Sequence, residues 1–121
     1  MKSETDCELL KLAAKAAGYE LIQYSDHLGW QILDSDDGDT AWFDPINDDG
    51  DAFRLAVKLY IDTEFFLYAT QANFSDAKGD IHHVNVGISE GTCNGSRAAS
   101  SRRAVVRAAA EIGSWTGNSE A

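Results

Sequence analysis

The chain has 121 residues, is 44% hydrophobic and carries a formal net charge of −10. This length fits one domain over residues 1–121 and supplies enough apolar side chains for a core. The acidic balance argues against direct binding of nucleic acid, because a negative surface repels phosphate, but it permits a basic protein partner.

The cysteines and the apolar runs indicate where the protein works. Cys7 and Cys93 lie far apart and form no CxxC pattern, so we expect reduced thiols. The first six residues are polar, unlike a signal peptide. No run approaches the roughly 18 apolar residues of a membrane span. We therefore expect a soluble cytoplasmic protein that makes no contact with a membrane.

The first half of the chain predicts a helix followed by short strands. Thr5 and Glu8 have the spacing of a capping box at a helix start, and Gly18 is a natural helix stop. The strand signals that follow are short and rich in aromatic residues. They cover residues 19–24, 28–33 and 40–43.

A second helix is expected after the only proline, Pro45. Asp48 or Asp49 caps its start, and it runs to about Tyr60. Apolar residues recur along it at helical spacing. Its predicted buried face consists of Phe53, Ala56, Leu59 and Tyr60.

The last elements predicted are a long hairpin and a helix. Residues 61–72 and 81–88 alternate in hydrophobicity, as two antiparallel strands do. The last helix begins near Ser96 and ends near Trp115, and we expect the tail from about residue 117 to be flexible. The expected order, α-β-β-β-α-β-β-α, predicts an α+β fold in which three helices pack on one antiparallel or mixed sheet of about five short strands.

Three stretches carry a resemblance to known proteins. They are residues 12–18 (LAAKAAG), 42–59 (WFDPINDDGDAFRLAVKL) and 101–113 (SRRAVVRAAAEIG). Together they resemble a family of small phage and prophage proteins with an α-β-α sandwich domain, and the middle stretch is the most specific. The resemblance implies a phage origin and a fold. The family is mostly uncharacterised and has no established catalytic motif, so no catalytic residues carry over.

An acidic block without lysine or arginine occupies residues 34–51. Such a block repels itself unless it is solvated, binds a cation or faces a basic partner. Neither Gly38 nor Gly50 sets an EF-hand register, and we expect no metal and no other cofactor. Local roles in turns and caps remain open beside a partner-binding surface that imitates phosphates. The block consists of Asp34, Asp36, Asp37, Asp39, Asp44, Asp48, Asp49 and Asp51.

Histidine and cysteine provide the remaining chemistry. His82 and His83 are adjacent on a strand, so they face opposite sides and cannot both bind one metal. We expect one to be half-buried and the other exposed. Cys93 lies in a loop that can expose a thiol, and a histidine could serve as its base. The contact is not visible in the sequence, and we predict no catalytic residue.

Arg103 and Arg107 are neighbours at i,i+4 on the last helix and share a face with Glu111. One interpretation is a solvated face with an Arg107–Glu111 pair. The other is a cationic patch that binds an acidic surface, either of a partner or of a second copy in a homodimer.

The leading functional prediction is a non-enzymatic phage protein that binds and inhibits a host defence complex. Its sharpest version is an anti-CRISPR protein whose acidic block occupies a basic nucleic-acid channel of a host protein or nucleoprotein complex. One alternative is a module that binds a small molecule or a nucleotide signal, with Arg97 or Arg102 in its pocket. Another is a small enzyme centred on Cys93.

Overall fold

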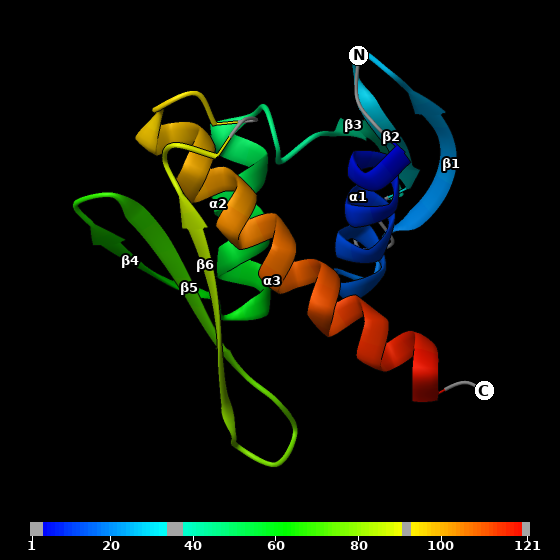
Figure 1. Cartoon of the computed structure of the whole chain (residues 1–121). Helices are drawn as coiled ribbons and strands as arrows, with labels where there is room; N and C mark the ends of the chain where they lie inside the picture. Colours follow the sequence, from blue (N-terminus) through cyan, green and yellow to red (C-terminus); the bar gives the residue numbers. More distant parts are fainter. Residues whose placement is uncertain (1–3, 34–37, 91–92, 120–121) are drawn as a thin grey trace.

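The computed structural model describes residues 4–33, 38–90 and 93–119, with side chains from Asp6 to Trp115 within these ranges. In the described ranges the chain forms three helices and six strands (Figure 1). The helices are α1 (Glu4–Ala16), α2 (Asp49–Leu59) and α3 (Arg97–Ser119). The strands are β1 (Glu20–Ser25), β2 (Gly29–Leu33), β3 (Thr40–Phe43), β4 (Asp62–Phe66), β5 (Ala69–Ser75) and β6 (Ile81–Gly87).

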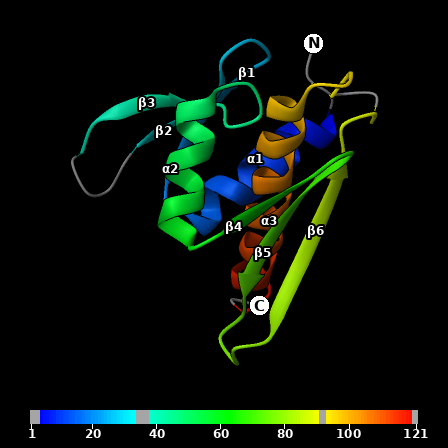
Figure 2. The ribbon, with the colours of Figure 1, turned by 90° about the vertical axis from the view of Figure 1, so that its left-hand side faces the viewer.

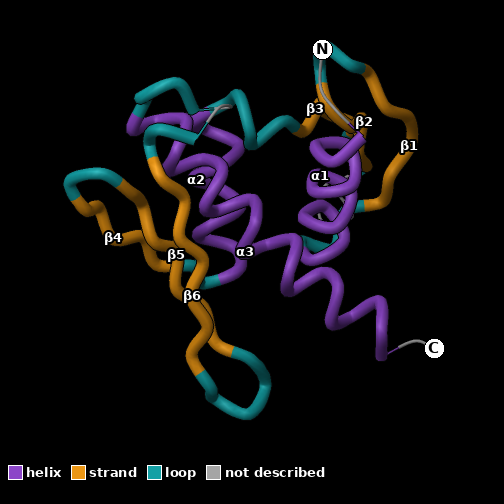
Figure 3. Tube along the Cα trace, in the orientation of Figure 1, coloured by secondary structure: helices purple, strands orange, loops and turns teal. Residues whose placement is uncertain are grey.

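The strands form two antiparallel sheets rather than one. Within the described residues, sheet A has the order β1-β2-β3 and sheet B the order β4-β5-β6. Figure 3 shows the strands in orange, with β1 to β3 beside α1 and β4 to β6 in a separate group. The predicted α+β class with three helices is confirmed. The prediction of a single sheet of about five strands is wrong, because the chain makes six strands in two sheets.

The extra strand arises at a turn that the sequence hides. Residues 61–72 were expected to form one strand, but Phe66 pairs with Ala69 and the two residues between them reverse the chain. These residues, Leu67 and Tyr68, are not among the described residues with a positive φ. The turn therefore needs neither glycine nor asparagine, the residues that usually identify a two-residue hairpin.

α3 is the central element of the core. It packs against α1, α2 and sheet B. Small side chains allow the close approach to α1: Ala13 and Ala14 of α1 are fully buried, as are Ala104 and Ala108 of α3. At the same crossing, a Cβ at Gly113 would overlap the carbonyl oxygen of Leu12, so only glycine fits there.

Both ends of α2 follow from local chemistry. The Asp48 carboxylate accepts a bond of 2.8 Å from the backbone N–H of Asp51, which confirms the predicted N-cap. At the other end, Tyr60 adopts the left-handed conformation, and its N–H donates to the carbonyls of Ala56 and Val57. α2 is thus a helix with defined limits that continues through Ile61 into β4.

Candidate functional site

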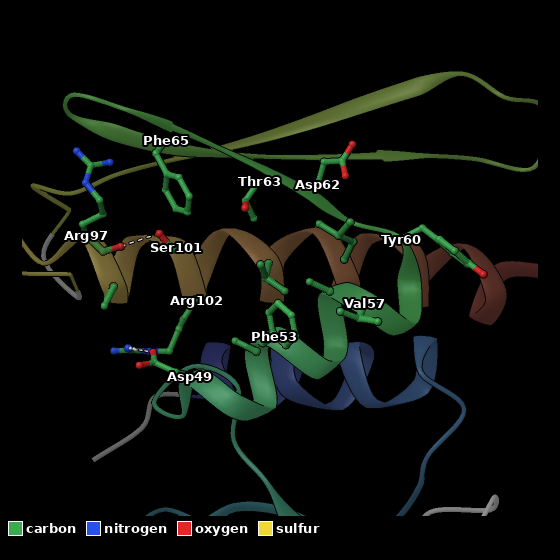
Figure 4. Close-up of a pocket in the computed structure, with 15 residues that line it drawn as sticks. Asp49, Phe53, Val57, Tyr60, Asp62, Thr63, Phe65, Arg97, Ser101 and Arg102 are labelled. Atoms are coloured by element: carbon green, nitrogen blue, oxygen red, sulfur yellow. Dashed lines mark hydrogen bonds and ion pairs between the residues drawn. The ribbon is translucent and has the colours of Figure 1, made fainter.

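A groove of about 1030 Å³ lies between α2, β4 and the first half of α3 (Figure 4). We call it the α2–β4 groove. Apolar residues make up most of its lining, and three of them are aromatic: Phe53, Tyr60 and Phe65. Its charged lining residues are Asp49, Asp62, Arg97 and Arg102.

α2 forms one wall because it carries apolar residues on two faces. Leu55 is buried on the core side. Phe53, Val57 and Tyr60 follow one another at helical spacing beside that face, and they are 71%, 59% and 89% exposed. The prediction that Phe53 and Tyr60 lie on the buried face of this helix is therefore wrong. Their exposure creates an apolar wall.

β4 forms the opposite wall. Its register pairs Thr63 with Ala72 and Phe65 with Thr70, so these four residues share the inner face of sheet B. α3 covers the β5 side of this face, where Ala72 and Thr70 are fully buried. It hardly reaches β4, and Phe65 stays 63% exposed. In Figure 4, Phe65 points from β4 across the groove towards α3.

Arginines anchor one end of the groove. The Nε of Arg102 donates to the carbonyl of Ile46 at 2.7 Å, and its guanidinium pairs with Asp49 at 2.6 Å. Arg97 donates to the carbonyl of Leu67 at 2.9 Å and so holds the β4–β5 turn. Asp62 lies towards the other end (Figure 4). The groove therefore has two arginines at one end, where Asp49 pairs with Arg102.

Local hydrogen bonds and ion pairs account for part of the acidic block. Asp44 is buried, its side chain accepts a bond from Asn47, and its N–H donates to Asp51 at 2.9 Å. Asp51 also pairs with Arg54 at 2.7 Å. These carboxylates link β3 to the start of α2 rather than forming an open surface.

The other members of the block are more exposed. Asp48 caps α2, and Asp49 pairs with Arg102. Asp39 lies at the surface. Whether the exposed members face a basic partner stays a prediction. Three members of the block, Asp34, Asp36 and Asp37, lie outside the described residues.

Arg103 and Arg107 do not share a solvated face. Arg103 is buried and pairs with Asp6 of α1 at 2.9 Å, so its guanidinium is not presented to a partner. Arg107 is half-buried and lies 3.4 Å from Glu90 rather than pairing with Glu111, the partner in the first of the two interpretations. The second interface predicted for these two arginines therefore loses Arg103.

The two histidines face opposite sides of sheet B, as predicted. His82 is half-buried, stacks on Phe74 and donates to Asp76 at 3.0 Å. His83 is exposed and bonds Asn73 on the outer face. The hydrogen bond from His82 is the main cause that lowers the pKa of the Asp76 carboxyl below its usual value. This cluster ties the ends of β5 and β6 together.

The loop around Cys93 does not expose its thiol. It is buried in the hydrophobic core, and the hydrogen bonds of both histidine rings go to other side chains. Within the described residues, no group of three or more histidine, cysteine, aspartate or glutamate side chains could hold a metal ion. The same part of the chain has no helix both long and apolar enough to cross a bilayer.

Comparisons of the chain with protein-family profiles, with curated proteins and with solved structures found no match. The resemblance to small phage proteins therefore stays a prediction. The groove itself has a partial signal in the sequence: α2 holds more apolar residues than one core-facing stripe needs.

Proposed function

We propose that the chain is a non-enzymatic protein that binds a partner protein through the α2–β4 groove. One observation carries the proposal: Phe53, Val57, Tyr60 and Phe65 are all largely exposed and all line the same groove. Soluble monomers rarely expose large contiguous apolar patches unless these serve an interaction. Exposed aromatic rings also supply much of the binding energy at protein interfaces.

The partner that we propose is a basic protein or nucleoprotein complex of a bacterial host. The net charge of −10 supports it, because opposite charge speeds and orients association. Asp48 and Asp49 lie at the start of α2, next to the groove. Together with the resemblance to phage proteins, this favours an inhibitor of host defence in the host cytoplasm. An anti-CRISPR protein is the sharpest version.

The enzyme hypothesis receives less support. A catalytic cysteine needs an accessible thiol with a base within reach. Cys93 is buried, and both histidine rings bond elsewhere. These contacts favour a binding role over a catalytic one.

Capture of the partner with matched variants tests the proposal. The tagged chain is incubated with a lysate of the bacterial host, and bound proteins are identified by mass spectrometry. Phe53→Ser with Val57→Ser removes apolar surface from the groove. Ile22→Ser with Leu28→Ser removes half-exposed apolar side chains away from it. We expect the partner to be lost only with the groove variant. Equal recovery by both variants would refute docking in the groove.

A second candidate function is the binding of a small anionic ligand. Both arginines named for a nucleotide-binding module, Arg97 and Arg102, line the groove beside its aromatic residues. A guanidinium has five N–H donors, so Arg97 retains donors for a phosphate. A nucleotide that binds tightly should raise the melting temperature at low salt. Arg97→Met should abolish this rise, and the absence of any rise across a nucleotide panel would dismiss the candidate.

A further inference from the structure

Sheet B has room for a fourth strand beside β4. We propose that an extended segment of the partner protein pairs with β4 and turns alternate apolar side chains into the α2–β4 groove. The other side chains of this segment, which point away from the groove, are basic. This inference rests on the proposed function and names the chemistry of the segment that is bound.

β4 presents an open backbone edge. It is the outer strand of sheet B in the described part of the chain. In an antiparallel ladder every second residue bonds to the neighbouring strand. Phe66 and Ala69 close the hairpin as a hydrogen-bonded pair. Glu64, two residues earlier, forms the next hydrogen-bonded pair with Gln71. The backbone groups of Thr63 and Phe65 then point to the open side. Such an edge accepts a strand from another protein.

The position beside β4 also lies over an apolar surface. Figure 2 looks onto sheet B, with α3 behind the sheet and α2 beside β4, where the described chain places no strand over it. α2 turns Phe53 and Val57 towards this space (Figure 4). A strand added to β4 would cover these side chains, as β5 covers α3. The exposed face of α2 and the open edge of β4 thus have one common occupant.

The carboxylates of β4 indicate which polar side chains the bound segment carries. Thr63 and Phe65 face the groove, so Asp62 and Glu64 alternate with them and carry carboxylates on the outer side. Residues directly opposite on a paired strand interact, and opposite charges stabilise the pair. Lysine or arginine should therefore lie opposite Asp62 and Glu64, and apolar residues opposite Thr63 and Phe65.

A second copy of the chain fits this edge less well. When the whole of β4 pairs antiparallel with itself, Glu64 lies opposite Glu64 of the other copy, and like charges directly opposite destabilise a sheet. The two chains would also bring together net charges of −10 each. Charge thus favours a basic partner over self-pairing.

Peptide binding tests the inference with the intact chain. The probe is a labelled peptide of roughly ten residues that alternates leucine and lysine. One control replaces lysine with glutamate, and the other has the composition of the probe but leucines at helical spacing. We expect the probe to bind at least about tenfold more tightly than either control by fluorescence anisotropy at physiological ionic strength, where screening weakens unspecific attraction.

Variants of Thr63 test the backbone edge. Thr63→Pro removes one outward N–H and should weaken binding of the probe about tenfold, whereas Thr63→Val keeps the N–H and should bind normally. Hydrogen exchange of the unmodified chain provides a test without a variant: the Thr63 and Phe65 amides should become protected when the probe binds.

The outcomes separate this inference from the proposed function. Unprotected amides, equal binding by Thr63→Pro, or tighter binding of the helical control would overturn strand addition, even if the groove variant still loses the host partner. No binding of the probe would also overturn it. Concentration-dependent dimers that Thr63→Pro abolishes would assign the edge to a second copy instead.

Discussion

Tyr60 ends α2 in a backbone conformation that tyrosine rarely adopts. Its φ of 57° and ψ of 44° lie in the left-handed region, where glycine is the usual helix-ending residue. A side chain there costs about 1–2 kcal/mol. Tyr60 is 89% exposed, so packing within the described fold returns little of this cost. We therefore expect Tyr60→Gly to stabilise the fold while it weakens binding in the α2–β4 groove.

The magnitudes follow from opposing terms. Relief of the left-handed strain favours the glycine variant, and the greater freedom of glycine in the unfolded chain opposes it by about 0.5–1 kcal/mol. The net gain should be about 0.5–1 kcal/mol, or roughly 2–4 °C in melting temperature for a domain of this size. Loss of the ring from an interface should cost about 2 kcal/mol of binding energy, which is roughly thirtyfold in Kd.

Two matched variants separate backbone from side chain. Asn94 is the other non-glycine residue with a positive φ in the described chain, at 49°, and it does not line the groove. Asn94→Gly should leave binding unchanged and stabilise less, since asparagine tolerates this region better. Tyr60→Phe keeps the ring and should resemble the wild-type chain. Urea unfolding measures stability, and titration with the isolated partner measures affinity.

Either half of the expectation can fail separately. A Tyr60→Gly chain that is less stable than wild type would show that the tyrosine side chain repays its strain inside the fold. A more stable chain with unchanged affinity would place Tyr60 outside the interface.

Three further predictions concern the fold. Gly113→Ala would stabilise an isolated helix by about 1 kcal/mol, but in the folded chain the added Cβ overlaps the Leu12 carbonyl oxygen. We therefore expect urea unfolding to show a net loss of about 1–3 kcal/mol in the free energy of unfolding. Unchanged stability would contradict this expectation. Because hydrogen bonding to His82 holds the folded pKa of Asp76 below 3.8, its carboxylate adds stability above about pH 4 that is lost as the pH falls through the folded pKa. The stability difference between wild type and Asp76→Asn should therefore shrink in acid, and a difference independent of pH would refute the linkage. Burial raises the pKa of Tyr24 from 10.0 to about 12, with smaller effects of nearby acidic groups. The free energy of unfolding should therefore decline as the pH rises through this interval. Tyr24→Phe should remove that part of the decline in alkaline urea titrations.

Local chemistry explains which parts of the fold were predictable. Asp48 caps α2 through a bond to a residue three positions away, and the Ser96 hydroxyl accepts a bond from the N–H of Ala99 at the start of α3. His82 and His83 separate to opposite faces because a strand alternates. Each of these outcomes depends on neighbours in the sequence, so the residue types alone were sufficient.

Contacts between distant segments explain the errors. Arg103 is buried because Asp6, far away in the sequence, supplies its partner on α1. Arginine side chains are mostly exposed unless they are paired. Without the contact to Asp6, the sequence therefore indicates that Arg103 lies at the surface. The Leu67–Tyr68 turn likewise lacks a local signal, and the pairing of β4 with β5 determines its position. The sequence contains both partners in each case, but nothing in it states that they meet.

The groove was only partly predictable from the sequence. An apolar surplus on α2 is readable in the sequence, because a helix turns one stripe towards a core and this helix has apolar residues beyond that stripe. Which stripe becomes the wall is decided by packing against α3, where Arg102 bonds Ile46 and Asp49. Exposed rings and a strained Tyr60 are separate costs to the folded chain. Both fall on the groove wall of α2. A partner bound there would cover the exposed rings, and its contact with the Tyr60 ring would offset the strain of a tyrosine at that position. A binding function thus gives one reason for two features that folding alone does not favour.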